Sequence, residues 1–101
     1  MSVARHWTGV AKAECAEAYV DHLRHDTFPT LRALPGFVDA SILRRSVPAG
    51  VEFLIVTNWE SLDVIRAFAG DNVDDAVVPD VVRDMMVSYD RIVRHYDRVH
   101  A

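Results

Sequence analysis

Val51-Glu52-Phe53-Leu54-Ile55-Val56-Thr57-Asn58-Trp59-Glu60-Ser61 is the stretch of sequence that decides the fold. Only one of its first six side chains is polar, and β-branched and aromatic residues, which favour strands, dominate it. A strand with one solvated face alternates polar and apolar residues, and this stretch does not alternate. We therefore expect a strand that is covered on both faces, by the chain's own helices on one side and by something else on the other.

The chain before this strand predicts a first strand, two helical pieces and a second strand. Residues 3–10 carry large side chains on both faces of an expected strand. Apolar residues follow helical spacing over 13–26, and a proline near the start of 27–34 predicts a second short helical piece that is capped by its first residue. Residues 37–46 alternate again, and the turn residues of 47–50 predict a hairpin with the strand quoted above.

The chain after this strand predicts two helices and a last strand. Ser61 suits the N-cap of a helix, and Gly70 suits its end. Residues 76–87 offer apolar side chains for another short helix, and residues 88–99 alternate as one last strand. This order predicts an α+β, ferredoxin-like βαββαβ fold, in which a four-stranded antiparallel sheet carries its helices on one face. The length fits a single domain over residues 1–101.

The other face of such a sheet is bare, and the apolar central strand contributes to it. An exposed apolar patch of that size is unusual on a monomer. Pairing with the same face of a second copy covers the patch by two-fold symmetry. We therefore expect a homodimer through the open sheet face, which forms a dimeric α+β barrel.

Composition and charge exclude several classes of function. Half of the residues are hydrophobic, and the formal net charge is −4, which argues against a nucleic-acid partner. No apolar run approaches the length of a membrane span, so we expect no membrane partner and a soluble, cytoplasmic protein. Cys15 is the one cysteine, so no intrachain disulfide forms. His22 and His25 lie three residues apart but lack a third nearby ligand, so we expect no metal site.

Several short motifs along the chain are shared with a known family. The sequence resembles the antibiotic biosynthesis monooxygenase-like family of dimeric α+β barrels in the segments 5–9, 19–23, 34–37, 52–54, 57–61, 65–70 and 95–96. The resemblance implies a site between the sheet and the helices of one subunit. It also implies cofactor-free oxidation of electron-rich phenols that react with oxygen after deprotonation.

We therefore expect a cofactor-independent monooxygenase that acts on an aromatic, quinol-like small molecule. A non-catalytic small-molecule binding module on the same fold is the alternative, and a structural subunit without a cavity is a third reading. The haem-degrading branch resembles this chain less well. Phe68 stands where that branch has a tryptophan, and no histidine lies between His25 and His95 to serve as the axial ligand.

The resemblance implies a set of site residues with distinct roles. The chemistry needs cationic or hydrogen-bonding groups at the developing oxyanion, an aromatic wall and a base. The expected catalytic residues are His95 and Arg5, and the expected substrate-binding residues are Trp7, Tyr19, Arg45, Asn58 and Trp59.

Three of these residues have structural alternatives. Trp59 is also a natural core residue. Arg5 is also a natural partner for Glu52 or Asp97, and His95 is also a natural buried histidine that hydrogen-bonds to a neighbour.

Overall fold

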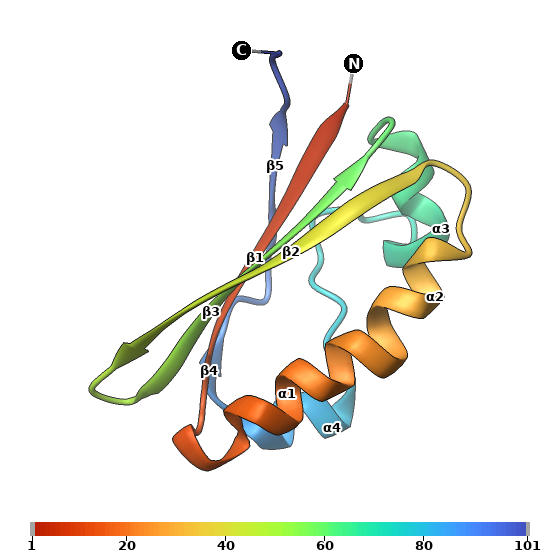
Figure 1. Cartoon of the computed structure of the whole chain (residues 1–101). Helices are drawn as coiled ribbons and strands as arrows, with labels where there is room; N and C mark the ends of the chain where they lie inside the picture. The colour runs from red at the N-terminus through yellow and green to blue at the C-terminus, as the bar shows by residue number, and fades with distance from the viewer. Residues whose placement is uncertain (1, 101) are drawn as a thin grey trace.

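A twisted antiparallel sheet with all of its helices on one face forms the fold (Figure 1). The computed structural model of the chain describes residues 2–100. The strand order is β2-β3-β1-β4, and a further strand, β5, also pairs with β1. The prediction of an α+β fold with an antiparallel sheet and one helical layer is confirmed. The strands are β1 (Val3–Ala11), β2 (Phe37–Val47), β3 (Gly50–Trp59), β4 (Met86–Tyr89) and β5 (Arg94–Asp97).

The apolar strand β3 lies inside the sheet and pairs with β1 and β2 along its whole length. Its alternation defines two faces. Phe53, Ile55 and Trp59 are buried on the side of the helices, which we call the helix face. Leu54 and Val56 are half-buried on the other side, which we call the open face. The chain's own helices therefore cover one face of β3 and leave the other exposed.

The β2–β3 hairpin closes next to the end of β1, and one glycine allows this approach. Gly50 has φ of +154°, and a Cβ atom at this position would lie 2.1 Å from the backbone oxygen of Ala11. Because that oxygen belongs to the backbone of a paired strand, it has little room to move. The tight contact therefore requires glycine at the first residue of β3.

A continuous helical segment connects β1 to β2, and here the prediction of a break capped by Thr27 is wrong. Thr27 has helical dihedral angles and makes no capping hydrogen bond. Phe28 instead donates its backbone N–H to the oxygen of Leu23, five residues earlier, which widens the helix by one residue. Pro29 lacks an N–H, and its ring would clash with the carbonyl four residues earlier in a regular α-helix. A π-helical turn just before the proline relieves that clash, and the helix continues. The parts of this segment are η1 (Ala13–Cys15), α1 (Ala16–His22), the π-helical turn η2 (Leu23–Thr27) and α2 (Phe28–Arg32).

The second helical region begins and ends as expected. The backbone N–H of Val64 donates to Ser61 Oγ at 3.4 Å, and Gly70 ends the region with φ of +82°. The predicted short helix further along the chain is α4 (Asp80–Met85), which buries Val82. The region from Ser61 to Gly70 consists of η3 (Asp63–Ile65) and α3 (Arg66–Ala69). Within residues 2–100, no helix has the length and apolar character needed to cross a membrane.

The last strand is interrupted, so the prediction of one unbroken strand over residues 88–99 is wrong. Tyr89 pairs with Gly9, and His95 pairs with Arg5. The six residue steps from Tyr89 to His95 therefore lie opposite only four steps on β1, so this part of the chain has two more residues than its partner. The extra residues belong to the connection between β4 and β5, where Ile92 forms an isolated bridge with Asp75. The connection thereby fastens the segment 71–79 to the edge of the sheet.

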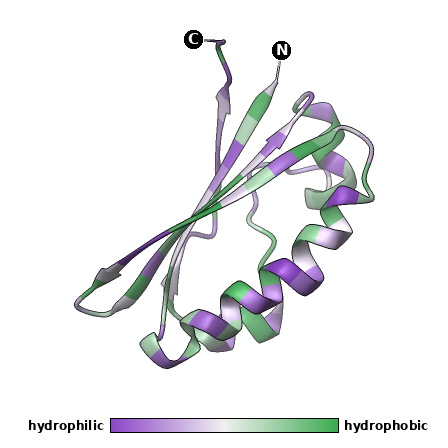
Figure 2. Ribbon diagram, in the orientation of Figure 1, coloured by the Kyte–Doolittle hydropathy of each residue, from purple (hydrophilic) through white to green (hydrophobic). Residues whose placement is uncertain are grey.

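The core lies between the helix face of the sheet and the helical segment. Figure 2 shows apolar and polar residues alternating around the helix that runs through α1 and α2. Its apolar side meets the sheet through Tyr19, Val20, Leu23 and Phe28. The largest fully buried side chains are Trp59, Phe53, Leu31 and Ile65.

Replacing Ile65 by alanine is expected to lower the free energy of unfolding by about 2–5 kcal/mol, because the side chain is 0% exposed and its loss leaves a cavity. Ile92→Ala removes the same atoms from a side chain that is 58% exposed, so a loss below about 1 kcal/mol is expected. Urea denaturation followed by circular dichroism measures both changes. Equal losses at the two positions would contradict the core described above.

Candidate functional site

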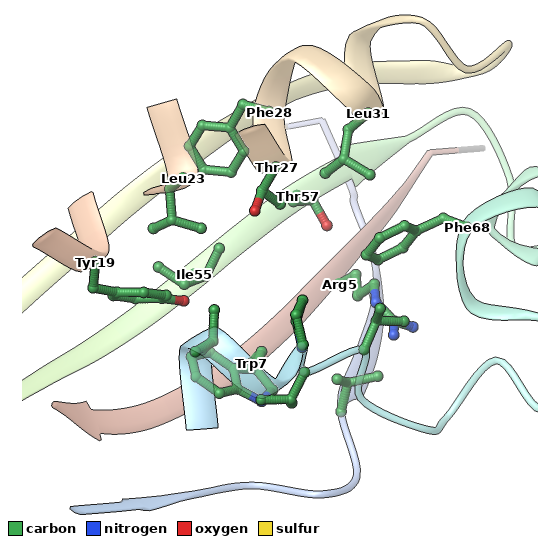
Figure 3. A pocket seen from close by; sticks show the side chains of 15 residues that line it. Arg5, Trp7, Tyr19, Leu23, Thr27, Phe28, Leu31, Ile55, Thr57 and Phe68 are labelled. Carbon is green, nitrogen blue, oxygen red and sulfur yellow. The ribbon is translucent and has the colours of Figure 1, made fainter. Parts of the chain in front are cut away.

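A cavity of about 70 Å³ lies between the helix face of the sheet and the helical layer (Figure 3). Its walls come from β1 and β3, from the helical segment that contains η2, from α3, from the stretch 77–82, and from the connection between β4 and β5. The lining residues are Arg5, Trp7, Tyr19, Leu23, Thr27, Phe28, Leu31, Ile55, Thr57, Phe68, Val77, Val78, Pro79, Val82 and Val93. Most of these side chains are apolar, so the cavity favours an apolar ligand.

Trp7 forms a large aromatic wall, and two neighbours fix the position of its indole. A Cβ atom on Gly9 would lie 2.5 Å from the indole ring, so glycine allows the ring to lie close along β1. Trp7 Nε1 donates a hydrogen bond to the backbone oxygen of Asp90 at 2.8 Å. The ring also lies 6.1 Å from that of Tyr19, centroid to centroid. The indole therefore presents a held aromatic surface to the cavity.

Three neutral hydroxyl groups supply polar contacts in the cavity wall. They belong to Tyr19 on α1, Thr27 on η2 and Thr57 on β3. Burial raises the pKa of Tyr19 well above its usual value, so its hydroxyl stays protonated and can donate. Thr57 Oγ1 accepts a hydrogen bond from Trp59 Nε1 at 2.9 Å, which leaves its own proton free to donate elsewhere. These groups suit the oxygen atoms of an otherwise apolar ligand.

Arg5 is the one charged residue among the described residues that line the cavity, but its polar end is already engaged. Nη1 donates to the backbone oxygen of Val73 and contacts His95 Nε2 at 3.0 Å, while Nη2 donates to the backbone oxygen of Asp75 at 2.8 Å. Figure 3 shows the guanidinium nitrogens on the side away from Tyr19. The cavity therefore meets mainly the carbon atoms of Arg5.

The guanidinium of Arg5 stays charged at neutral pH. Burial lowers its pKa to about 10, and the nearby charge of Asp74 opposes that shift. The ring of Phe68 lies 5.7 Å from Arg5 Cζ, within the range of a cation–π contact. The cavity wall therefore carries a fixed positive charge, and this charge can act on a ligand without a hydrogen bond from Arg5.

His95 lies behind Arg5 and is not one of the lining residues. Arginine has only donors, so His95 Nε2 accepts from Arg5, and we assign the ring proton to Nδ1, which lies 3.3 Å from Asp74 Oδ1. Burial lowers the pKa of His95, with the charge of Arg5 acting in the same direction and Asp74 opposing it. His95 is therefore neutral at pH 7, but both of its nitrogens are engaged.

The structure brings together some of the expected site residues and separates others. Trp7, Tyr19 and part of Arg5 line the cavity, and His95 reaches it only through Arg5. Trp59 is fully buried in the core, with its ring 5.2 Å from that of Phe37. The core alternative therefore describes its position.

Arg45 and Asn58 lie on the open face, away from the cavity. Arg45 pairs with Glu52 at 2.7 Å beside a shallow depression near the hairpin, and Asn58 donates to Asp39 at 2.6 Å. The position of Asn58 follows from β-strand alternation, because it neighbours Thr57, whose side chain faces the cavity. The same alternation identifies Thr57, which the sequence reasoning did not include among the site residues. No sequence pattern indicates that Thr27 faces the cavity, because its position depends on the π-helical turn.

Solved structures of several oxygenases share this fold. The chain matches a mutant of SnoaB, a cofactor-independent oxygenase from Streptomyces nogalater, with 15% identity and a TM-score of 0.66 over 99% of this chain and 95% of that chain. It matches a monooxygenase from Streptomyces coelicolor in complex with nanaomycin D with 17% identity and a TM-score of 0.64 over 99% and 88% of the two chains.

A haem-degrading protein from Mycobacterium tuberculosis also matches, with 19% identity and a TM-score of 0.66 over 100% of this chain and 98% of that chain. At these identities the three structures show a shared fold and nothing finer. A search of curated proteins found no match.

A family model settles the classification that the sequence resemblance predicted. The model described as antibiotic biosynthesis monooxygenase matches residues 4–72, which is more than half of the chain. The matched region runs from β1 through α3 and includes Arg5, Trp7 and the three hydroxyl-bearing residues of the cavity. This chain belongs to the antibiotic biosynthesis monooxygenase family.

Proposed function

We propose that this protein is a cofactor-independent monooxygenase that oxidises an aromatic, quinol-like small molecule in the cavity between sheet and helices. The observation that carries the proposal is the combination of aromatic walls with neutral hydroxyl donors in an otherwise apolar space. Trp7, Phe28 and Phe68 suit the faces of a fused-ring ligand, and the hydroxyls of Tyr19 and Thr57 suit its oxygen atoms. SnoaB is a cofactor-independent oxygenase, which is in keeping with this reading.

The reaction needs little covalent chemistry from the protein. A phenol with a free ring position takes up dioxygen, places one oxygen atom on the ring carbon and releases the other as water, which leaves a quinone. The hydroxyl proton and the ring hydrogen end in that water. The substrate must first lose its hydroxyl proton, so negative charge develops on its oxygen. In a water-poor cavity, hydroxyl donors and the fixed charge of Arg5 stabilise that negative charge.

Haem degradation is not the function that this cavity favours, although one structural relative is a haem-degrading protein. Haem iron takes a histidine, cysteine, methionine or tyrosine ligand. The described lining residues include no histidine, cysteine or methionine. Tyr19 is the one possible donor of this kind, and burial raises its pKa, which disfavours the tyrosinate form. The donor set therefore does not fit haem.

We also propose that two copies of the chain pair through the open face. On that face Leu43 of β2 lies opposite Leu54 of β3, and Leu43 is 51% exposed in the single chain. Tyr96 of β5 is also exposed there and packs against His6, with 4.9 Å between ring centroids. The open face thus carries exposed apolar side chains on β2 and β5, which a second copy would cover.

The activity is expected to depend on the hydroxyls in the cavity. With a panel of hydroxynaphthalenes and anthrones, Thr27→Val and Tyr19→Phe are each expected to slow oxygen uptake about ten- to a hundredfold, because each removes a hydrogen bond to a developing charge. Thr30→Val is the matched control on the same helix, since Thr30 is exposed and its hydroxyl donates to the backbone oxygen of Asp26. An oxygen electrode measures the rates. Wild-type rates equal to the buffer rate for the whole panel would exclude the activity, and a ligand that raises the melting temperature but returns unchanged would then indicate a binding module.

The pairing of two copies is tested by placing a charge on the open face. The wild-type protein is expected to sediment as a dimer at micromolar concentration, and Leu54→Lys is expected to shift it to a monomer because an unpaired charge is costly in an apolar interface. Leu62→Lys is the matched control, since Leu62 is exposed at the start of the second helical region and not on the sheet. A wild-type monomer in sedimentation velocity would contradict the proposal.

A further inference from the structure

The cavity has a volume of about 70 Å³, which is small for the ligand class proposed above. Pockets that hold such ligands measure roughly 300–1,000 Å³, so we expect one of the walls to move when a ligand enters. The walls made by β1, β3 and α1–α2 belong to a continuous sheet and a continuous helix. Phe68 and Val82 come from the helices α3 and α4, and the rest of the lining comes from Val93 in the β4–β5 connection and from the stretch 77–79, which belongs to an irregular segment.

This irregular segment, residues 71–79, is fastened to the sheet at three consecutive residues. Arg5 donates to the backbone oxygens of Val73 and Asp75, and His95 Nδ1 lies 3.3 Å from Asp74 Oδ1. Two backbone hydrogen bonds join the same region, from Val93 N–H to the oxygen of Asp74 and from Ala76 N–H to the oxygen of Arg91. Arg5 and His95 thus hold the segment from β1 and β5, directly before its cavity-lining part.

We propose that Arg5 and His95 are positioning residues that latch the segment 71–79 shut over the cavity, and that a proton on His95 Nε2 opens this latch. The proposal rests on the proposed function only in taking the cavity to receive an apolar aromatic ligand. It assigns to His95 the control of ligand entry and not the role of a base that touches the substrate.

The contact between Arg5 and His95 exists only while His95 is neutral. Protonated histidine carries an N–H on both nitrogens, so Nε2 then faces the Arg5 donor with a donor of its own. Two positive charges would also stand about 3.0 Å apart in a half-buried place. Arg5 from β1 opposes the proton, and Asp74 from the segment favours it. Asp75 on the segment and Arg94 and Asp97 on β5 are exposed and nearby in sequence, so solvent screens them more strongly.

The direction of the pH effect follows from the pKa of His95. Burial and Arg5 lower this pKa in the closed form below the ordinary value of about 6.5, which an open form would recover. The open form therefore binds the proton more tightly. Closure is fully favoured above pH 6.5 and weakens as the pH falls below that value.

Amide hydrogen exchange of the intact protein tests the latch without any ligand. The amides of Ala76 and Val93 report on the segment, since both are bonded between it and the β4–β5 connection. Between pH 7.5 and 5.0, their protection factors, corrected for intrinsic exchange, are expected to fall severalfold. The amide of Glu60, bonded to the oxygen of Gly36, is expected to keep its protection. Protection of Ala76 and Val93 that does not change with pH would overturn the proposal.

Two variants separate the latch from general acid instability. His95→Gln offers Arg5 an oxygen acceptor that does not titrate, so protection is expected to become independent of pH. His6→Gln removes a second histidine whose pKa is lowered by burial, on the open face, and is expected to leave the wild-type pH dependence unchanged. A pH dependence of amide protection that persists in His95→Gln, or that vanishes in His6→Gln, would contradict the assignment to His95.

A third measurement keeps the test decisive if His95→Gln does not fold. Nitrogen NMR of the wild-type imidazole is expected to show the proton on Nδ1 at pH 7.5 and a titration midpoint that coincides with the loss of protection at Ala76. Midpoints more than one pH unit apart would overturn the proposal. Because neither readout needs turnover, a wild-type protein that never consumes oxygen would refute the proposed function and leave the latch standing.

Discussion

A buried guanidinium joins the sheet of this protein to the least regular part of its chain, and the site depends on that junction. Arg5 is 4% exposed, and a charge at such depth is costly unless its donors are satisfied. Two backbone oxygens and a histidine nitrogen satisfy them here. The backbone oxygens of Val73 and Asp75 lie outside any helix or strand, and they accept hydrogen bonds from Arg5. The guanidinium thus gains acceptors and the carbonyls gain a donor, which explains how a stretch without helix or strand can form a cavity wall.

Local pattern was sufficient to predict most of the fold. The uninterrupted apolar run in β3, the helical spacing after Ala13 and the turn residues before Gly50 each depend on neighbours in sequence, and each prediction is confirmed. The two errors arise where tertiary structure decides. At Thr27 the chain continues its helix through a wider turn. Between β4 and β5 two extra residues interrupt the pairing with β1, and the connection binds the segment 71–79 instead.

The site was harder to predict than the fold, because residue type does not say what a side chain will meet. Arginine, tryptophan and histidine suit phenol chemistry by residue type, yet Arg5 donates to backbone oxygens 68 and 70 residues away. No pattern in the sequence marks them. Asn58 and Trp59 suit a site as polar and aromatic residues, but strand alternation and core packing place them elsewhere. Thr57, with a smaller and less conspicuous side chain, is the residue of that stretch that reaches the cavity.

The two extra residues between β4 and β5 also limit how the chain can change in length. Successive side chains of a strand point to opposite faces, so an even number of extra residues preserves the faces on which Tyr89 and His95 lie. Adding or deleting a single residue in this connection would turn every later side chain over. His95 would then point away from Arg5, and Arg94 after an insertion, or Tyr96 after a deletion, would take its place inside. Related chains that keep this junction should therefore differ in length here by two residues and not by one.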